Sequence, residues 1–348
     1  AYFMEMGTGK SKVCIDNAGI LYERELIDTF IVIAPKGVYR NWATIEIPAH
    51  MPERIERDVV VWTPSPTKQE KTNLELLLEP SETNNLRILL MNIEALSTPK
   101  GTRYLDKVLD QGACLLAVDE STAIKSPKAR RTKAVIKLGK KAKYKRILTG
   151  FPVTQSPLDL WAQCNFLHPH LLGKDVGTNF FQFQYRYAIM KKRSVGSHSF
   201  NMVVGYRNLD NLSEIIKKFS SRVMKAECLD LPPKLYTQRQ VQLTPDQQRL
   251  YTEIKEYALA HLGDNDFMTA PNVMTQLIRL QQVLSGHTKT DEGKLVEIKD
   301  NRLTELMDCL EDTSGKVIIW SRFRYDIERI QKALVKEYGP PSTVTYYG

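Results

Sequence analysis

The chain has 348 residues and a formal net charge of +9, and its length favours two or three domains rather than one core. Hydrophobic residues make up 42% and charged residues 26%, which is typical of a soluble globular protein. The longest apolar runs fall well short of the roughly 20 residues that a membrane-spanning helix needs, so we expect no membrane partner.

Five cysteines lie far apart, and no two of them form a Cys-x-x-Cys pair. This spacing excludes a recognisable disulfide framework or zinc site and predicts reduced, buried thiols. The positive charge suits a polyanionic partner such as nucleic acid. Charge alone leaves binding and the absence of binding equally open.

Near the start of the chain, residues 4–13 read MEMGTGKSKV, and no strand is apparent before them. Backbone N–H groups of a glycine-rich turn at a helix N-terminus bind phosphate, so this stretch predicts a phosphate loop. In this interpretation, the Lys10 ammonium reaches the β- and γ-phosphates of ATP, and the Ser11 hydroxyl is a ligand of Mg²⁺. Met4 stands where the full pattern has its first glycine, and a chance glycine-rich turn is the alternative. The predicted ATP-binding residues are Gly7, Thr8, Gly9, Lys10 and Ser11.

Short β-branched runs then alternate with helical patterns up to about residue 166. The predicted strands are FIVIAP (30–35), DVVVW (58–62), LRILLMN (86–92), CLLAVDE (114–120) and KRILTG (145–150). Because these runs are apolar on both faces, they predict a parallel sheet with helices on each side. The fold class is therefore α/β.

The fourth of these strands ends in an acid pair, Asp119 and Glu120. In phosphate-loop NTPases a strand-end aspartate helps to hold Mg²⁺, and a neighbouring glutamate can orient and deprotonate the attacking water. Alone, the pair has an alternative interpretation as a helix cap. Behind a phosphate loop it predicts the catalytic residues of an ATP hydrolase, which are Lys10, Asp119 and Glu120.

A strongly basic run follows, because residues 125–146 hold eleven Lys or Arg and no acid. We expect Ser126 and Pro127 to start a helix that buries Ala134, Val135 and Leu138 and turns the charges to solvent. The run is interpreted either as a solvated surface or as a phosphate-binding surface, since neutralised phosphates release counterions.

Beyond residue 170 the pattern becomes aromatic-rich and then helical, with an apolar stripe at Leu212, Ile215, Ile216 and Phe219 behind a predicted Asn211–Glu214 capping box. Further along, alternation predicts a strand at 235–243. A helix is expected to begin at a Thr244 cap. A stripe at 303–310 predicts another helix, and strands are expected at 316–320 and 344–348.

Several segments resemble one known family when they are taken in order. These are IVIAPKGVYRNW, ILLMNIEALS, DESTAIKSP, RILTGFPVTQSPLDLWAQCNFLHP, LPPK, LTPDQQRLY and KVIIWSRF. Together they resemble the Swi/Snf-type branch of helicase superfamily two, in particular its strand-annealing and phage-encoded members. Phe151 departs from the usual threonine of LTGTP, and Thr122 stands where DEAH sequences have histidine.

The resemblance implies two RecA-like lobes with ATP and Mg²⁺ in the cleft between them. Residues 1–170 would form lobe one, 171–230 a helical protrusion, and 231–348 a linker, a helical insertion and the N-terminal part of lobe two. The family's segment before the phosphate loop and its last motifs have no counterpart here. We therefore expect an incomplete piece of a larger protein, poorly active by itself.

The resemblance also implies contacts to the phosphates and sugars of DNA, which carry no sequence information. The candidates after two strands are Lys36, Arg40, Asn92 and Glu94, and those in the basic run are Lys125, Lys128, Arg130 and Arg131. The residues expected to couple the nucleotide to DNA are Thr149, Gly150 and Gln155.

The resulting hypothesis is an ATP-dependent translocase or remodeller of double-stranded DNA. One alternative is a strand-separating helicase on single-stranded DNA or RNA, and another is a non-catalytic nucleic-acid-binding fragment. The expected partners are duplex DNA and replication, recombination or repair proteins. The expected location is the cytoplasm of a bacterial or phage-infected cell, or the nucleus if the source is eukaryotic.

Overall fold

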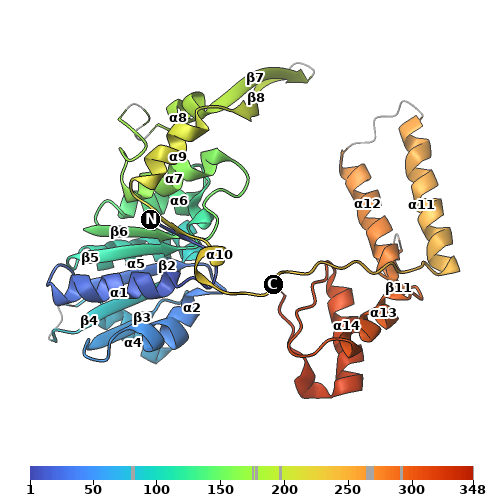
Figure 1. Cartoon of the computed structure of the whole chain (residues 1–348), viewed down its shortest axis with the longest axis horizontal. Helices are drawn as coiled ribbons and strands as arrows, with labels where there is room; N and C mark the ends of the chain where they lie inside the picture. Colours follow the sequence, from blue (N-terminus) through green and yellow to red (C-terminus); the bar gives the residue numbers. More distant parts are fainter. Residues whose placement is uncertain are drawn as a thin grey trace. The chain divides into compact units, whose positions relative to one another are not determined.

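The computed structural model describes residues 1–348 except 80–82, 175, 177–178, 196–197, 264–269, 291–292 and 348. The chain divides into two compact units, Ala1–Pro232 and Pro233–Gly348 (Figure 1). Each unit is described by itself below.

The first unit is built on a seven-stranded parallel sheet with the order β3-β4-β2-β5-β6-β1-β9. Its strands are β1 (Tyr2–Met4), β2 (Thr29–Ala34), β3 (Arg57–Val61), β4 (Leu86–Asn92), β5 (Cys114–Asp119), β6 (Tyr144–Leu148) and β9 (Ser221–Val223). The five predicted strands and their parallel arrangement are confirmed. The expectation that no strand precedes the phosphate loop was wrong, because β1 does so; at three residues it is too short to show a pattern.

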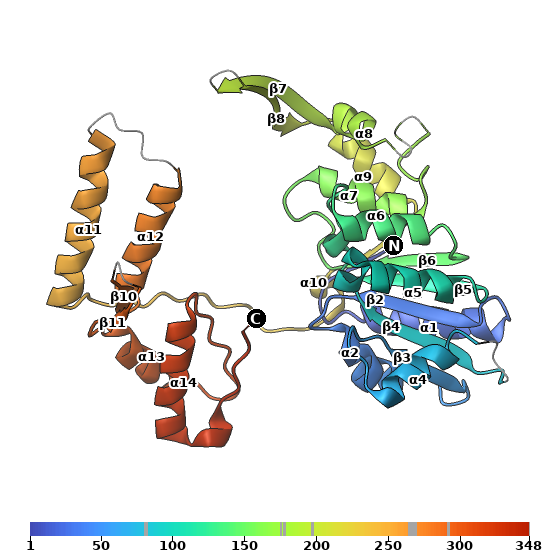
Figure 2. The same cartoon turned by 180° about the vertical axis from the view of Figure 1, so that it is seen from behind.

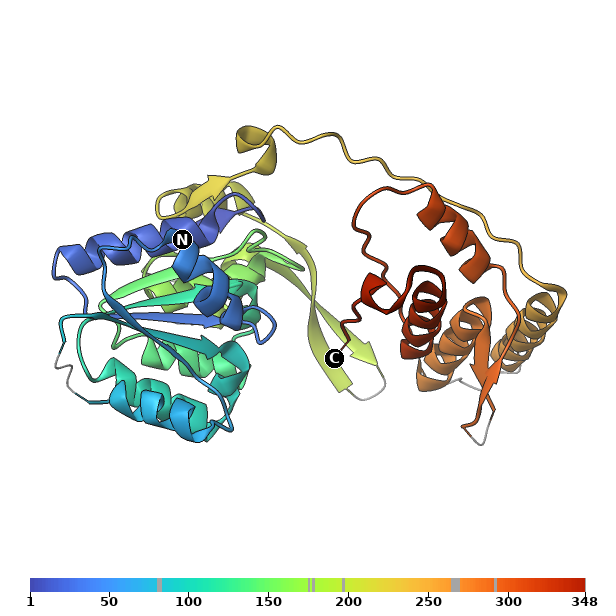
Figure 3. The ribbon, with the colours of Figure 1, turned by 90° about the horizontal axis from the view of Figure 1, so that it is seen from below.

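Helices cover both faces of this sheet (Figure 3). They are α1 (Lys10–Glu23), α2 (Tyr39–Asn41), α3 (Ile47–His50), α4 (Lys68–Leu76), α5 (Pro99–Leu109), α6 (Arg130–Leu138), α7 (Leu160–Leu167), α8 (Phe180–Tyr187), α9 (Leu209–Lys217) and α10 (Lys225–Cys228), with a π-helix at Trp42–Glu46 between α2 and α3. Successive residues of β2 point to opposite faces of the sheet, and helices cover both faces, so every residue of the strand is apolar or buried. Phe30 and Val32 pack with α1 and α3, whereas Ile31 and Ile33 belong to the core under α4 to α9.

The segment 171–230, predicted as a helical protrusion, contains an antiparallel hairpin as well as helices. Strands β7 (Ala188–Val195) and β8 (His198–Tyr206) pair between α8 and α9, and Figure 2 shows the hairpin extending beyond these helices. The predicted apolar stripe of α9 is confirmed, because its residues pack on the core. The predicted capping box at Asn211 was wrong: the helix begins at Leu209, after Asn208 in a left-handed conformation.

Helix α6 also begins later than predicted. Its N-cap is Ala129 rather than Ser126, and Ser126 and Pro127 lie in the turn before the helix. The predicted inner face is confirmed at Val135 and Leu138, which are buried.

Within its described residues, the second unit has four α-helices, a short hairpin and a 3-10 helix at Pro340–Ser342. The α-helices and the hairpin are α11 (Pro245–Gly263), α12 (Ala270–Leu284), the antiparallel pair β10 (His287–Lys289) and β11 (Leu295–Glu297), α13 (Arg302–Glu311) and α14 (Arg324–Tyr338). The helix predicted at 303–310 is confirmed as α13. The Thr244 cap is also confirmed. The Gln247 N–H donates to Thr244 Oγ1 at 3.3 Å, and the Thr244 N–H donates to Gln247 Oε1 at 3.1 Å.

Three predicted strands of this unit were wrong. Residues 235–243, 316–320 and 344–347 have no strand assignment, and Gly348 lies outside the described residues. The side chains of Ile318 and Trp320 are 79% and 89% exposed. A strand requires a hydrogen-bonded neighbour, and none pairs with these segments within the part of the chain that the structure describes.

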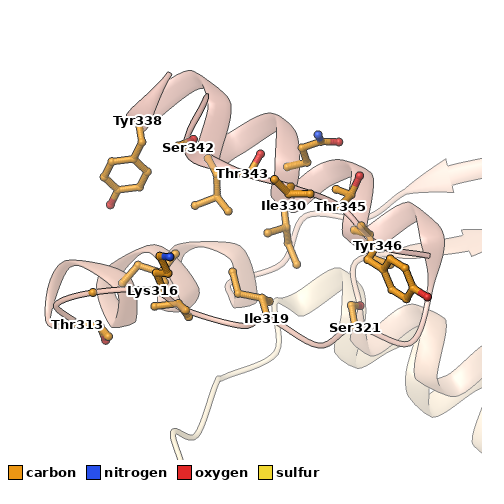
Figure 4. A pocket seen from close by; sticks show the side chains of 17 residues that line it. Thr313, Lys316, Ile319, Ser321, Ile330, Tyr338, Ser342, Thr343, Thr345 and Tyr346 are labelled. Carbon is orange, nitrogen blue, oxygen red and sulfur yellow. The ribbon is translucent and has the colours of Figure 1, made fainter. Parts of the chain in front are cut away.

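A pocket of about 690 Å³ lies between α14 and these two C-terminal segments. Figure 4 shows Ile330 of α14 on one side and Ile319 of the extended segment on the other. Its lining is mostly apolar, with Lys316 as the one charged residue. The pocket therefore offers no acid–base pair, and the candidate site lies in the other unit.

Of the five cysteines, Cys14, Cys114 and Cys164 are buried as predicted. The prediction was wrong for Cys228, which is exposed, and Cys309 is only half-buried. Among the helices of the described residues, none combines the length and the apolar character needed to cross a membrane.

We predict that Thr244→Ala lowers the free energy of unfolding of the second unit by about 1 kcal/mol, because it removes the cap of α11. The Thr244 hydroxyl also donates to the Lys299 carbonyl at 2.8 Å, so the loss affects two segments. Thermal unfolding followed by circular dichroism measures it. Thr252→Ala, inside the same helix, is the control and should leave stability almost unchanged; equal effects of the two substitutions would contradict the prediction.

Candidate nucleotide-binding site

The parallel register of the first unit brings several predicted residues to one edge of the sheet. Ala34 pairs with Asn92, and Asp119 pairs with Leu148. Strand β1 continues past this level, because Tyr2 pairs with Leu148. The phosphate loop after β1, the acid pair after β5 and the turn after β6 therefore all emerge at the carboxyl edge, where ligands bind in open α/β sheets.

The phosphate loop is a tight turn from β1 into α1. Gly7 and Gly9 have φ values of 80° and 89°, which favour glycine over residues with a side chain. The Thr8 N–H and hydroxyl both donate to the Glu5 carbonyl, at 3.3 and 2.7 Å, and thereby close the turn. Gly9 caps α1 without a side-chain acceptor, so the first N–H groups of the helix are left for an anion.

Lys10 begins α1, and its ammonium donates to the Glu5 carbonyl at 3.4 Å. Ser11 follows in the first turn and is half-buried. The predicted loop residues thus lie in one turn, and the cation and the hydroxyl come from the same helix end.

Asp119 is the more buried acid of the pair. Its side chain is 7% exposed, and two donors hold it. The Trp42 indole N–H donates to Oδ2 at 3.0 Å, and the Glu120 backbone N–H donates to Oδ1 at 2.9 Å. Burial raises the pKa of Asp119 and the negative charge of Glu120 raises it further, whereas the hydrogen bond from Trp42 and the charge of Lys10 oppose this change.

Glu120 has a left-handed backbone, with φ 46° and ψ 57°. Such a conformation is strained for a residue with a side chain and is common at functional sites. Its carboxylate accepts a hydrogen bond from the Thr149 hydroxyl at 3.3 Å, and the Thr149 N–H donates to Tyr2 of β1 at 3.1 Å. Thr149 therefore connects the acid pair to the strand that carries the phosphate loop.

Of the other two predicted coupling residues, Gly150 lies against the loop. A Cβ placed on it would lie 3.5 Å from the Glu5 Cα. Gln155 belongs to a turn further on. There its backbone N–H donates to Asp159 at 3.0 Å, and its side chain is exposed. The structure therefore groups Thr149 and Gly150 with the acid pair but leaves Gln155 apart.

The DNA-contact candidates at this edge have different surroundings. Lys36 is exposed just after β2, and Arg40 is exposed with its guanidinium 5.8 Å from the centre of the Tyr39 ring. Asn92 is only 8% exposed, and its amide donates to Glu94 Oε2 at 3.1 Å. Lys36 and Arg40 are accessible to a phosphate, whereas Asn92 and Glu94 already bond to each other.

Helix α6 divides the basic run between opposite edges of the sheet. At its start, the Lys125 ammonium donates to the Thr154 hydroxyl at 2.6 Å and Arg131 donates to the Ala123 carbonyl at 2.8 Å, while Lys128 and Arg130 are exposed. Beyond its C-terminal end, Lys141 pairs with Asp106 and Asp110 at 2.6 and 2.7 Å. The run is therefore not one continuous surface, and its exposed cations Lys128 and Arg130 lie at the carboxyl side.

Sequence reasoning missed Trp42 as a site residue. A buried indole N–H requires an acceptor, which is a usable signal. That the acceptor is Asp119, 77 positions along the chain, follows only from the fold.

A glycine-rich turn between a strand and a helix, beside an acid pair in a parallel sheet, defines an α/β unit of the phosphate-loop class. The chain belongs to the SNF2-related domain family, whose model matches residues 3–288. This family lies within helicase superfamily two, as the resemblance implied.

Three curated relatives illustrate the similarity. The chain is 24% identical over 337 residues to an uncharacterized ATP-dependent helicase, MG018, of Mycoplasma genitalium, covering 95% of this chain and 29% of that protein. It is 26% identical over 232 residues to the DNA annealing helicase and endonuclease ZRANB3 of Bos taurus, covering 66% and 20%. It is 26% identical over 292 residues to the chromatin-remodeling ATPase INO80 of Arabidopsis thaliana, covering 80% and 18%. The chain thus spans less than a third of each relative.

One solved structure is the Sulfolobus solfataricus SWI2/SNF2 ATPase core in complex with double-stranded DNA. It matches with a TM-score of 0.48 and 23% identity, over 97% of this chain and 65% of that one.

We predict that Glu120→Gln stabilises the first unit at neutral pH by about 1 kcal/mol, or 2–4 °C in unfolding midpoint. The folded-state pKa of Asp119 is raised, so stability is lost as pH rises through that pKa. Removing the Glu120 charge lowers the pKa of Asp119 and therefore reduces the stability that is lost when Asp119 ionises at neutral pH. The gain should disappear at a pH low enough to protonate both carboxyls, and a gain that persists there would contradict the explanation.

We also predict that Trp42 and Asp119 are energetically coupled. Trp42→Phe removes a hydrogen bond to a charged group and should cost about 1.5–3 kcal/mol of unfolding free energy. In an Asp119→Ala background the same substitution should cost at least 1 kcal/mol less, since no carboxylate is left to lose its donor. Denaturant unfolding of the four proteins of this cycle measures the coupling; additive effects would show that the indole acts only through packing.

Proposed function

We propose that this chain is the nucleotide-binding part of an ATP-dependent translocase or remodeller that acts on duplex DNA. The observation that carries the proposal is that the phosphate loop and the acid pair with its buried Asp119 follow neighbouring parallel strands at one sheet edge, in a chain of the SNF2-related family. The relatives, an ATP-dependent helicase and a chromatin-remodeling ATPase among them, support ATP turnover.

In this proposal Gly7, Thr8 and Gly9 bind the ATP phosphates through backbone N–H groups, and Lys10 neutralises their charge. Mg²⁺ bound with the nucleotide would neutralise further charge on the β- and γ-phosphates. The Ser11 hydroxyl and the Asp119 carboxylate fit it, because they supply the oxygen donors that this ion prefers. Trp42 would hold the orientation of Asp119.

Glu120 would orient the attacking water and accept its proton. The bond from Thr149 positions the Glu120 carboxylate and connects it to the turn after β6. We infer that this turn, through Thr149 and Gly150, transmits the state of the nucleotide to the surface that binds DNA. Positioning and charge stabilisation account for catalysis of phosphoryl transfer in such a site.

We retain the proposed division into lobe one (1–170), protrusion (171–230), and linker with the start of lobe two (231–348). The second unit supports it by its order of extended segment 316–320, helix α14 and extended segment 344–347. The alternation of extended and helical segments is the order found in α/β units, although neither extended segment is paired as a strand here.

For DNA, we propose that the exposed cations Lys36, Arg40, Lys128 and Arg130 contact phosphates. Lys125 and Arg131 would instead stabilise the turn before α6, through their hydrogen bonds to the Thr154 hydroxyl and the Ala123 carbonyl. Contacts of this kind are independent of base sequence, which suits a protein that steps along any duplex.

We predict that Lys10→Ala lowers ATP turnover by at least 100-fold, because the loop loses the charge that stabilises the transferring phosphoryl group. Glu120→Gln should retain ATP binding while hydrolysis falls by a similar factor. Binding of a fluorescent ATP analogue and steady-state hydrolysis, each with and without duplex DNA, separate the two effects.

Lys12→Ala is the control for Lys10→Ala. Lys12 is exposed on the same helix, and among the described residues its ion pair is with Asp16, so turnover should not change. Duplex, single-stranded DNA and RNA are compared as stimulants. Stimulation by single strands or RNA alone would replace the translocase with a strand-separating helicase, and an absence of turnover in every condition would leave a nucleic-acid-binding protein without catalysis.

A further inference from the structure

The β7–β8 hairpin of the first unit is rich in cations and free of acids. Between residues 176 and 209 the sequence has no Asp or Glu, and its basic residues are Arg186, Lys191, Lys192, Arg193 and Arg207. Three of these are consecutive on β7. A run this long without a carboxylate concentrates positive charge on one projection of the unit.

The three consecutive cations, Lys191, Lys192 and Arg193, are exposed. Within the described residues no ion pair joins any of them to a carboxylate, whereas Lys141 and Lys217 elsewhere in the same unit do have acidic partners. Their mutual repulsion is therefore not balanced by a carboxylate of the described residues. A polyanion would balance it.

The register places these cations on both faces of the ribbon. Lys191 lies opposite Met202 and Arg193 opposite Phe200 on one face, and Lys192 lies opposite Asn201 on the other. Paired strands lie about 5 Å apart, and the major groove of B-DNA, about 12 Å wide, admits a two-stranded ribbon. Cations on both faces of such a ribbon can reach phosphates on both sides of a groove.

The base of the hairpin is held to the core, so the charged strands have a defined position. The Arg207 N–H donates to the Tyr187 carbonyl at 3.0 Å, and the Asn208 amide donates to the Arg186 carbonyl at 2.9 Å. Tyr187 is buried, and its hydroxyl donates to Asn211 at 3.2 Å. A surface held in this way loses less conformational entropy when it binds.

The hairpin is also continuous with the cations at the start of α6. The residues that line a pocket of about 460 Å³ include Lys128, before α6, and Phe180 and Phe181 of α8. Helix α8, about 12 Å long, leads from this pocket to the hairpin. Along it Phe181 and Tyr185 are 73% and 76% exposed. The exposed surface thus extends from Lys128, which is proposed to bind DNA, to the three consecutive cations of β7.

We propose that the β7–β8 hairpin is a second binding surface for the phosphate backbone of duplex DNA, outside the carboxyl edge of the sheet. It rests on the proposed function only in that the protein acts on DNA, because the contact requires no nucleotide. An acidic protein partner is the competing interpretation. It predicts that neutralising the hairpin changes neither the affinity for DNA nor the dependence of that affinity on salt.

The test is the triple substitution Lys191→Gln, Lys192→Gln and Arg193→Gln, with binding to a fluorescent 30-base-pair duplex measured by anisotropy across a salt series without ATP. We expect at least a tenfold loss of affinity near 100 mM salt. The slope of log K against log salt should become shallower by about 2–3, at 0.9 per lost phosphate contact. Single strands of the same sequence are measured in parallel.

The matched control is Arg24→Gln, Lys107→Gln and Lys140→Gln, which removes the same charge from exposed positions at the opposite, amino edge. A second variant, Lys191→Arg, Lys192→Arg and Arg193→Lys, keeps the charge and should keep the slope, so it separates charge from folding. Equal slopes for the neutralised hairpin and the amino-edge control would overturn the proposal, as would a loss confined to single strands. Unchanged binding of the ATP analogue in every variant separates this result from any failure of the nucleotide site.

Discussion

The parallel hydrogen-bond register of β1, β2, β5 and β6 is the constraint on which the candidate site depends. Because all four strands run in one direction, the turns that follow them meet at one edge, although they are far apart in the sequence. A loop after β1, an acid pair after β5 and a threonine after β6 thereby become neighbours. Moving any one strand by a residue would turn its edge residues to the other face.

The site places a carboxylate where folding alone would not favour one. Asp119 is almost fully buried and stands beside a second acid, Glu120, whose backbone is strained. The Trp42 indole, a backbone N–H and the charge of Lys10 offset this cost in part. The energetic cost of this arrangement is a physical argument for a cationic ligand beside the acid pair.

The fold, and not the number of Lys and Arg in a stretch of sequence, determines where accessible positive charge lies on this chain. The densest basic run crosses from one edge of the sheet to the other along α6, and several of its members bond to nearby carbonyls, hydroxyls or carboxylates. The shorter run on β7 has no acid near it in sequence or in the described contacts. Accessibility and pairing therefore decide which cations can bind phosphate, and the count of lysines and arginines does not.

The sequence by itself determined the α/β class, five of the seven strands and the family, and it located the candidate phosphate loop and acid pair. These features are local: apolar runs, glycines at positive φ and acids at a strand end can be recognised from neighbouring residues. The Thr244 cap was found for the same reason. Local patterns failed where pairing decides the outcome. The apolar segments 316–320 and 344–347 have strand-like residues but no neighbouring strand, and β1 and β9 are strands only because neighbours pair with them.

The tertiary structure alone decided the contacts between distant residues. The bond from Trp42 to Asp119 spans 77 positions, the Thr149 bridge joins strands from three parts of the sequence, and the β7–β8 hairpin interrupts a segment whose composition indicated helices. Each depends on which segments lie side by side after folding, and that depends on burial and hydrogen bonding summed over the whole unit. The candidate residues for the chemistry can thus be recognised in the sequence, whereas their partners and their exposure are properties of the fold.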